Sequence, residues 1–308
     1  MHRPRSLVFL VLANLFWAGN FVFGAIAVER IDPLSLTWMR WLGAAPVLIA
    51  LAALIERPSW RTVFADWPRQ ILLSLLGMIG FCVLTYEAFR HTSPMDASLI
   101  NAINPALIAI SAALIARTRV SGRAILGLVI SLAGVLLVLT KGDLAALAGF
   151  RLNLGEGIMI AAVVVWSAYT LLGRTSPTPP ITGSALQASI ALVLLSPVVA
   201  VTGLTVPDAP EVWANVAYIA VFPSVLSFML WNLAVRDLGA GPAGITLNLI
   251  PVFVALIGLV LGLPITLDQL AGGVLVIAGV LLTNLPARTG MSTAGADAGA
   301  RPGRRGEG

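Results

Sequence analysis

One apolar stretch occurs twice in the chain, first as Gly127-Leu-Val-Ile-Ser-Leu-Ala-Gly-Val-Leu-Leu137 and again, 145 residues later, as Gly272-Gly-Val-Leu-Val-Ile-Ala-Gly-Val-Leu-Leu282. Pro105 and Pro251 keep nearly the same spacing, at 146 residues. Several matches in order at nearly one offset indicate that the second half of the chain duplicates the first. The glycines in both copies are expected to let two helices pack closely against each other.

The composition around this repeat is that of a membrane protein. Of the 308 residues, 58% are apolar and 11% are charged, whereas an ordinary soluble domain carries roughly 25% charged residues. Such a chain has too few charged side chains to cover a soluble surface, which excludes a water-soluble enzyme, a disordered chain and a coiled coil. The one cysteine, Cys82, excludes an intrachain disulfide. The composition therefore predicts a chain that crosses the membrane many times.

Apolar runs of about 20 residues, the length that crosses the core of a bilayer, alternate with short polar breaks. They predict ten transmembrane helices, at 6–28, 34–55, 70–89, 95–116, 122–140, 155–173, 184–204, 212–235, 242–262 and 268–285. Residues 1–140 and 155–285 each contain five of them. Because five is odd, the second half enters the membrane from the opposite side. We therefore predict an all-α integral membrane protein with two inverted five-helix repeats around a central cavity, where transporters of this type bind substrate.

The basic residues predict the orientation in the membrane. Fourteen of the 19 Arg and Lys residues fall in segments on the same side as the N-terminus, and Arg and Lys mark cytoplasmic loops. Both termini are therefore expected in the cytoplasm, with the chain in the cell (inner) membrane. The first span is expected to be a retained helix and not a cleaved signal peptide, because its apolar stretch from Leu7 to Val28 is long and Asn14 and Asn20 interrupt it. Residues 286–308 are rich in Gly, Ala and Arg, which predicts a disordered basic cytoplasmic tail.

Short motifs mark several of the spans. They are Trp17-Ala-Gly-Asn20, Arg40, Ala88-Phe-Arg-His-Thr-Ser93 with Ala97-Ser-Leu99 and Pro105, and the pair Leu132-Ala-Gly-Val135 and Ile277-Ala-Gly-Val280. Together, over about residues 6–285, they resemble the EamA-type drug/metabolite transporter (DMT) superfamily. The resemblance implies ten helices in two inverted bundles around a central cavity, and the export of small organic solutes. Where the family often has a Gly-Glu pair, this chain reads Arg117-Thr118 and Gly262-Leu263, so no role of those acids carries over.

The sequence carries no nucleotide-binding P-loop, no HExxH metal site and no CxxC motif. We accordingly expect no cofactor, no metal and no nucleic-acid partner, and we expect the lipid bilayer and a small-molecule substrate as partners. The leading hypothesis is a secondary transporter that exports small organic metabolites, such as amino acids or amphipathic and drug-like solutes, by alternating access. The alternatives are an integral-membrane enzyme that modifies lipids, and a passive pore or scaffold subunit.

Polar and aromatic side chains within the spans are the candidate substrate-binding residues. They are Trp17, Asn20, Arg40, Tyr86, Asn101, Asn104, Trp166, Tyr169, Asn232 and Asn248. Trp17 and Asn20 are three residues apart and share one helix face, and Trp166 and Tyr169 repeat this spacing in the matching span. The two-fold relation of the halves predicts that these faces meet. For each residue the alternative is an interhelical hydrogen bond or packing without a role in binding.

Arg40 and two prolines complete the predicted site. Arg40 either snorkels to the membrane surface between Trp38 and Trp41, or faces the cavity and attracts a carboxylate. Pro105 and Pro251 interrupt matching spans and are expected to bend the helices beside the cavity, as hinges.

Three ionisable residues, Glu87, Arg90 and His91, share one face of the third span near its outer end. Glu87 and His91 are the candidate groups for proton coupling, because an embedded carboxyl and a histidine can both take up a proton near neutral pH. The alternative is a local ion pair that neutralises Glu87.

Overall fold

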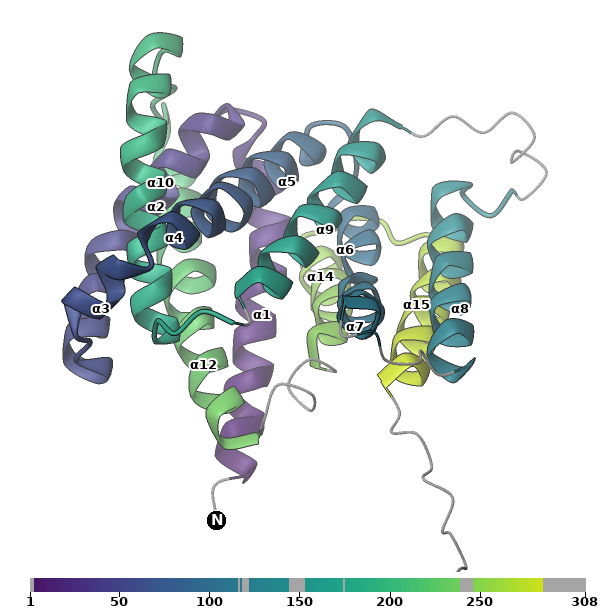
Figure 1. The fold of residues 1–308 in the computed structure, drawn as a ribbon. Helices are drawn as coiled ribbons and strands as arrows, with labels where there is room; N and C mark the ends of the chain where they lie inside the picture. The colour runs from purple at the N-terminus through teal and green to yellow at the C-terminus, as the bar shows by residue number, and fades with distance from the viewer. Residues whose placement is uncertain are drawn as a thin grey trace, which may run out of the picture.

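The computed structural model describes residues 3–115, 117, 122–143, 153–173, 175–238 and 246–284. Within these residues ten helical segments follow one another, and the fold is all-helical as predicted (Figure 1). Eight of the segments are long and apolar enough to cross a membrane, and the last two are shorter apolar helices. The predicted tail at 286–308 and Thr118 lie outside the described residues.

The first half contains five of these segments. They are α1 (Arg3–Ala27); α2 (Pro33–Leu51) continued by η1 (Ala52–Glu56); α4 (Trp67–Leu73), η2 (Ser74–Gly80) and α5 (Phe81–Phe89); α6 (Pro94–Asn101) and α7 (Asn104–Ile115); and α8 (Gly122–Leu139). The short helix α3 (Trp60–Ala65) precedes α4. Asp32 starts α2, because its carboxylate accepts hydrogen bonds from the N–H groups of Leu34 and Ser35, both at 3.0 Å.

The second half contains the other five. They are α9 (Leu154–Gly173); α10 (Pro180–Thr202); α11 (Pro210–Val221), η4 (Phe222–Leu226) and α12 (Ser227–Leu238); η5 (Thr246–Asn248) and α14 (Leu249–Val260); and α15 (Leu267–Asn284). Glu56 of the first half starts α10, because its carboxylate accepts hydrogen bonds from the N–H groups of Ile181 at 3.0 Å and Thr182 at 2.7 Å. A carboxylate at a helix N-terminus satisfies free N–H groups and complements the helix dipole.

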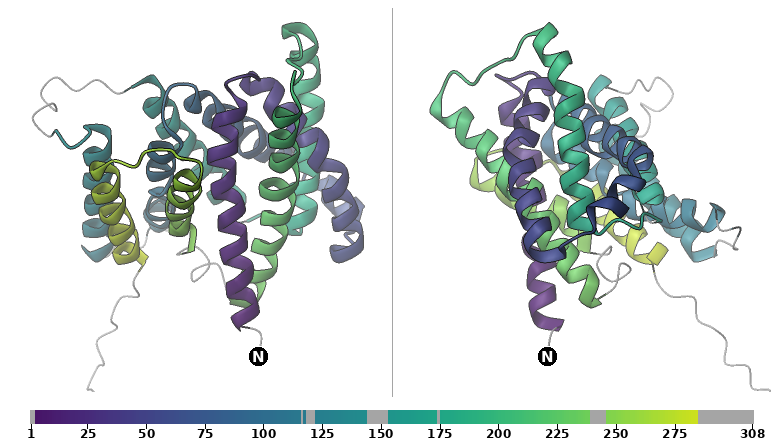
Figure 2. Two further views of the ribbon diagram at one scale, coloured as in Figure 1. Left: turned by 180° about the vertical axis from the view of Figure 1, so that it is seen from behind. Right: turned by 60° about the vertical axis from the view of Figure 1, so that its left-hand side comes forward.

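The helices of the two halves pack in exchanged pairs. Helix α1 of the first half packs on α12 and α14 of the second half. Its counterpart α9 of the second half packs on α5 and α7 of the first half. Helix α2 packs on α10 and α8 packs on α15, so each of these helices meets its own counterpart. The α2–α10 pair lies at one end of the molecule and the α8–α15 pair at the other (Figures 1 and 2). This reciprocal pattern is what a two-fold axis between inverted repeats requires.

Of the three π-helical segments among the described residues, η1, η2 and η4, the last two lie at matching places in the two halves. The π-helix η2 is part of the third of the ten helical segments, and η4 is part of the eighth. At the repeat offset of 146, residues 222–226 of η4 correspond to residues 76–80, which belong to η2. A π turn disturbs the usual pairing of backbone carbonyls. An indole N–H supplies a partner in each half, because Trp41 Nε1 donates to the carbonyl of Met78 at 2.8 Å and Trp17 Nε1 donates to that of Pro223 at 3.1 Å.

Helices α8 and α15 approach so closely that their contact requires glycine. A Cβ built on Gly134 would lie 2.6 Å from the carbonyl oxygen of Gly272, and one built on Gly279 would overlap the backbone of Gly127 and of Ser131. The Ser131 hydroxyl donates to a carbonyl of α15 at 3.1 Å across the same contact. The repeated glycine stretch therefore joins the two halves at this end of the molecule, as small residues do between membrane helices.

Candidate functional site

A cavity of about 650 Å³ lies between the two halves. Residues of α1, α2, η2, α5, α6 and α7 line it from the first half, and residues of α9, α10, α12 and α14 line it from the second. Eight of the ten candidate binding residues are in its wall: Trp17, Asn20, Arg40, Asn101, Asn104, Trp166, Tyr169 and Asn232. The other two, Tyr86 and Asn248, are buried and do not line it. The structure thus brings together the faces that the repeat predicted, while their role in binding stays a prediction.

Aromatic rings make up much of the cavity wall. Trp17 packs against Phe228 of α12, with ring centroids 5.8 Å apart. Trp166 packs against Phe81 of α5 at 4.6 Å and against Tyr169 at 5.0 Å. Each indole therefore lies beside a phenyl ring at the start of the helix that follows a π-helical segment. Such a wall suits a solute with an apolar or aromatic body.

The two matching indoles differ in one contact, which predicts different effects for the same substitution. The N–H of Trp17 donates to the carbonyl of Pro223, whereas that of Trp166 has no hydrogen-bond partner among the described residues. We expect Trp17→Phe to lower the free energy of unfolding by about 1–3 kcal/mol, because it leaves a carbonyl in η4 unpaired. Trp166→Phe should lower it much less. Thermal denaturation of both purified variants in one detergent measures this difference, and equal losses would contradict the assignment.

Arg40 faces the cavity and does not snorkel to the membrane surface. It is 6% exposed, and its Nη1 donates to the Tyr86 hydroxyl at 2.9 Å and to Asn20 Oδ1 at 3.3 Å. The Tyr86 hydroxyl donates to the same Asn20 oxygen at 3.0 Å, and the guanidinium lies over the ring of Trp41 at 4.8 Å. The snorkelling interpretation is therefore wrong, because these contacts hold the guanidinium inside the helix bundle.

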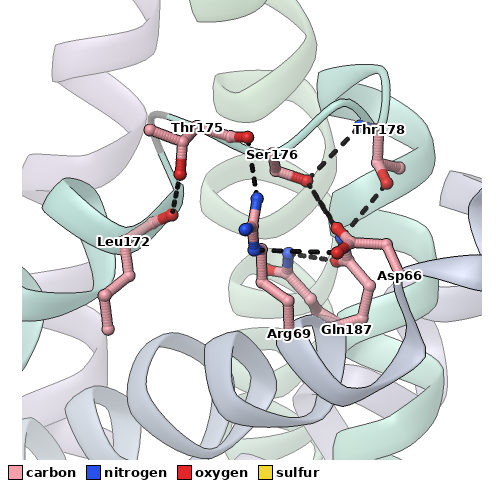
Figure 3. A network of polar contacts seen from close by, with 8 residues as sticks. Asp66, Arg69, Leu172, Thr175, Ser176, Thr178 and Gln187 are labelled. Carbon is pink, nitrogen blue, oxygen red and sulfur yellow. Dashed lines mark hydrogen bonds and ion pairs between the residues drawn. The ribbon is translucent and has the colours of Figure 1, made fainter.

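A polar network connects α4 and α10 to the loop between α9 and α10 (Figure 3). Gln70 is fully buried and accepts a hydrogen bond from Gln187 Nε2 at 2.8 Å. The Nε2 of Gln70 contacts Asp66 Oδ2 at 3.2 Å, and Ser176 Oγ and Thr178 Oγ1 at 3.1 Å each. Three of these residues, Ser176, Thr178 and Gln187, line the cavity. The sequence analysis missed them as site residues, although an amide inside an apolar span is a signal that points to such a position.

The sequence profile of the EamA-like transporter family matches residues 4–140 and 153–285, which cover both halves. The chain belongs to the EamA-like transporter family.

Relatives of this EamA-like protein span nearly its whole length. It is 29% identical to the uncharacterized transporter YyaM of Bacillus subtilis (strain 168), over 91% of this chain and 94% of that relative. It is also 29% identical to a probable terminal-alkyne amino-acid exporter of Streptantibioticus cattleyicolor, over 92% of this chain and 95% of that relative. A solved crystal structure shares the fold with a TM-score of 0.65, at 19% identity over 91% of this chain and 96% of that chain.

Family membership makes this EamA-like protein a multi-pass membrane transporter and not an enzyme. The hypothesis of a lipid-modifying enzyme, which rested on Glu87, Arg90 and His91, is therefore wrong. Glu87 Oε2 lies 3.3 Å from Arg90 Nη1 and Glu87 Oε1 lies 3.1 Å from His91 Nε2, with about a third of the Glu87 and His91 side chains exposed. Glu87 and Arg90 form a local ion pair at the end of α5, and His91 contacts the same carboxylate. Neither Glu87 nor His91 lines the cavity, so the structure does not bring the two candidate coupling groups to the site, and their coupling role stays a prediction.

The two prolines of this EamA-like transporter line the cavity, and each lies in the first turn of a helix. Helix α6 ends at Asn101 and α7 begins at Asn104, so the fourth segment breaks just before Pro105, as expected for a proline inside a span. Pro251 likewise lies in the first turn of α14, after the 3-10 turn η5. A proline in the first turn removes no helical hydrogen bond. The bend predicted at Pro251 is therefore a change from 3-10 to α-helix.

The cavity of this EamA-like transporter reaches one face of the helix bundle. Its lining includes residues 176–180, which lead from α9 into α10 on the face where α1 begins. No described residue of the loops on the opposite face lines it. A second cavity of about 450 Å³, which Leu263 helps to line, lies on that opposite face. Phe21 lines the first cavity and Phe89 the second, and their ring centroids are 5.5 Å apart, so two aromatic rings separate the cavities here.

Polar contacts join the two halves on this opposite face. Thr205 Oγ1 donates to Asp32 Oδ2 at 2.7 Å, and Gln269 Nε2 donates to Asp96 Oδ1 at 2.8 Å. Burial alone would raise the pKa of the Asp32 carboxyl, but hydrogen bonds from Ser35 and Thr205 hold that pKa below its ordinary value. A carboxyl with a lowered pKa keeps its stabilising contacts at neutral pH and loses them as the pH falls through the lowered value. The contacts of Asp32 are therefore intact at neutral pH.

Proposed function

We propose that this EamA-like transporter is a secondary carrier that exports small organic metabolites from the cytoplasm by alternating access. One observation carries the proposal: the cavity is shared by two inverted halves, reaches one face and is separated from the other by Phe21 and Phe89. Its volume of about 650 Å³ falls in the usual range for small-molecule sites, about 300–1,000 Å³. The relative named as a probable amino-acid exporter supports amino acids as the first class to test.

The orientation of the chain is the one that an exporter needs in order to load its solute. The excess of Arg and Lys on the N-terminal side favours a cytoplasmic location for the face that the cavity reaches. A solute would therefore enter from the cytoplasm in the conformation described, and leave once the far face opens.

The contacts that close the far face are weak, so little free energy is needed to break them and reach a second, outward-open conformation. A hydrogen bond such as Thr205 to Asp32 contributes about 0.5–3 kcal/mol, and an aromatic pair such as Phe21 and Phe89 adds about 0.5–1.5 kcal/mol. States that differ by only a few kcal/mol are both populated, and a bound solute can shift the balance between them.

Reconstitution in proteoliposomes tests the proposal. We expect purified protein to release radiolabelled amino acids at a rate that saturates with concentration, and to accumulate label transiently when unlabelled solute is loaded on the other side. Only a carrier that exposes one site to the two sides in turn gives this counterflow. Flux that rises linearly without counterflow would show a pore, and absence of flux for an entire metabolite panel would reject the transport of these solutes.

A further inference from the structure

Arg40 is a buried charge without a counter-ion. Among the described residues that line the cavity, Arg40 is the one charged side chain. Its hydrogen-bond partners, Asn20 and Tyr86, are neutral, and no described Asp or Glu forms a salt bridge with it. Its Nε is buried with no hydrogen-bond partner. Guanidinium stays protonated in proteins, and an unpaired buried charge is strongly destabilising, so this end of the cavity is suited to an anion.

The geometry around Arg40 also leaves neutral donors beside the charge. Guanidinium can only donate hydrogen bonds, so the Asn20 atom that contacts Arg40 Nη1 at 3.3 Å must be the oxygen Oδ1. The same oxygen accepts from Tyr86 at 3.0 Å. The amide nitrogen of Asn20 is therefore turned away from this contact, and it has no hydrogen-bond partner among the described residues. Asn20 and Arg40 both line the cavity, so the unused N–H groups of the Asn20 amide lie beside the guanidinium in the same part of the wall.

We propose that Arg40 and Asn20 form a site for a single carboxylate of the substrate, so that the transported solutes are organic monoanions or zwitterions with an apolar or aromatic body. This inference rests on the proposed function and narrows its substrate class. One guanidinium balances one negative charge, which favours a carboxylate over a doubly charged phosphate. Charge-assisted hydrogen bonds from guanidinium and amide N–H groups to a carboxylate are the strong kind, and the indoles of Trp17 and Trp166 face the rest of the solute. Organic cations are excluded because the cavity offers them a fixed positive charge and, among its described lining residues, no carboxylate.

Four probes with the same phenyl ring and two-carbon linker test the charge preference. They are 3-phenylpropionate as the anion, L-phenylalanine as the zwitterion, 3-phenylpropanamide as the neutral analogue and phenethylamine as the cation. Their binding to the purified full chain is titrated by intrinsic tryptophan fluorescence and by the shift in melting temperature. We expect the two carboxylates to bind at least about tenfold more tightly than the amide, and phenethylamine to bind most weakly.

Asn20→Asp separates a binding role of Arg40 from a structural one. The new carboxylate would accept the same hydrogen bonds from Arg40 and Tyr86 and would neutralise the guanidinium internally. If Arg40 serves only to join α1, α2 and α5, this variant keeps wild-type binding. If Arg40 binds the solute, the variant loses at least about tenfold in carboxylate affinity, loses much less of its affinity for 3-phenylpropanamide, and melts at or above the wild-type temperature. Arg40→Lys is the matched control, because it retains the charge and should keep part of the preference for carboxylates.

The outcomes separate this inference from the proposed function. Equal affinity for all four probes, no binding of either carboxylate, or unchanged carboxylate affinity in Asn20→Asp would overturn the carboxylate site. The metabolite panel in proteoliposomes tests transport independently of this site. Selective binding of carboxylates without flux of any solute would instead leave the carboxylate site standing and reject the carrier function.

Discussion

Gly279→Leu is expected to force α8 and α15 apart and to lower the free energy of unfolding by about 3 kcal/mol or more. A Cβ on Gly279 would overlap the carbonyl oxygen of Gly127 and the hydroxyl and backbone nitrogen of Ser131. Two of these three atoms belong to the backbone of α8, so they cannot yield unless the helix moves. Gly134 of α8 is equally close to α15, because a Cβ there would lie 2.6 Å from the carbonyl oxygen of Gly272. Helix α15 therefore has no room to slide along α8 and relieve the overlap.

Thermal denaturation in detergent measures this effect, with Gly157→Leu as the control. Gly157 also lies in a membrane helix, α9, but a Cβ there would meet no atom within 4 Å. We expect Gly157→Leu to melt close to wild type, since a better helix former replaces glycine in open space. Equal melting temperatures for the two leucine variants would show that the α8–α15 contact tolerates a side chain and would contradict the packing described here.

Gly183→Trp is expected to block transport with little loss of stability. Gly183 lines the cavity from α10, and a Cβ there would lie 3.6 Å from Gln187 Nε2 and 3.8 Å from Thr178 Cγ2, which are ordinary contact distances. An indole at this position would occupy space that a solute needs. We expect the saturable efflux rate to fall by at least about tenfold, which corresponds to 1.4 kcal/mol in the limiting step.

The matched control for this prediction is Gly183→Ala, which adds a methyl group and leaves most of the cavity empty. It should retain near wild-type flux and a similar melting temperature. Full transport activity in Gly183→Trp, with a normal melting temperature, would mean that solutes do not pass through this cavity.

Much of the fold and part of the site could be predicted from the sequence because both depend on periodicity. A span needs a run of apolar residues, and a repeat shows itself as a fixed offset, so the order of the segments and the pairing of the halves follow. The spacing of Trp17 and Asn20, repeated at Trp166 and Tyr169, places each pair on one helix face. The two-fold relation then brings those faces to the same cavity.

Other features depend on tertiary contacts that no local pattern contains. The orientation of Arg40 is set by Asn20 and Tyr86, which lie on different helices, so the sequence alone could not decide between its two interpretations. The π-helical segments could not be predicted from the sequence for the same reason. The carbonyl of Pro223 in η4, for example, accepts a hydrogen bond from the indole N–H of Trp17, which lies on α1. The helix starts at Pro105 and Pro251 were not predicted, because a proline looks the same in sequence whether it bends a helix or starts one.

Because the helices of the two halves pack in exchanged pairs, a helix such as α1 is synthesised long before the helix on which it packs. Helix α1 ends at Ala27, and its partner α12 begins at Ser227, 200 residues later. At translation rates of about 5–20 residues per second, α1 waits in the bilayer for roughly 10–40 s before that partner is made. Arg40 does not share this delay, because Asn20 and Tyr86 are both complete once α5 has been synthesised. The nascent chain thus shields the buried charge of Arg40 early, while a product truncated after α8 would keep the partner faces of α1 and α8 uncovered and offer them to membrane quality-control proteases.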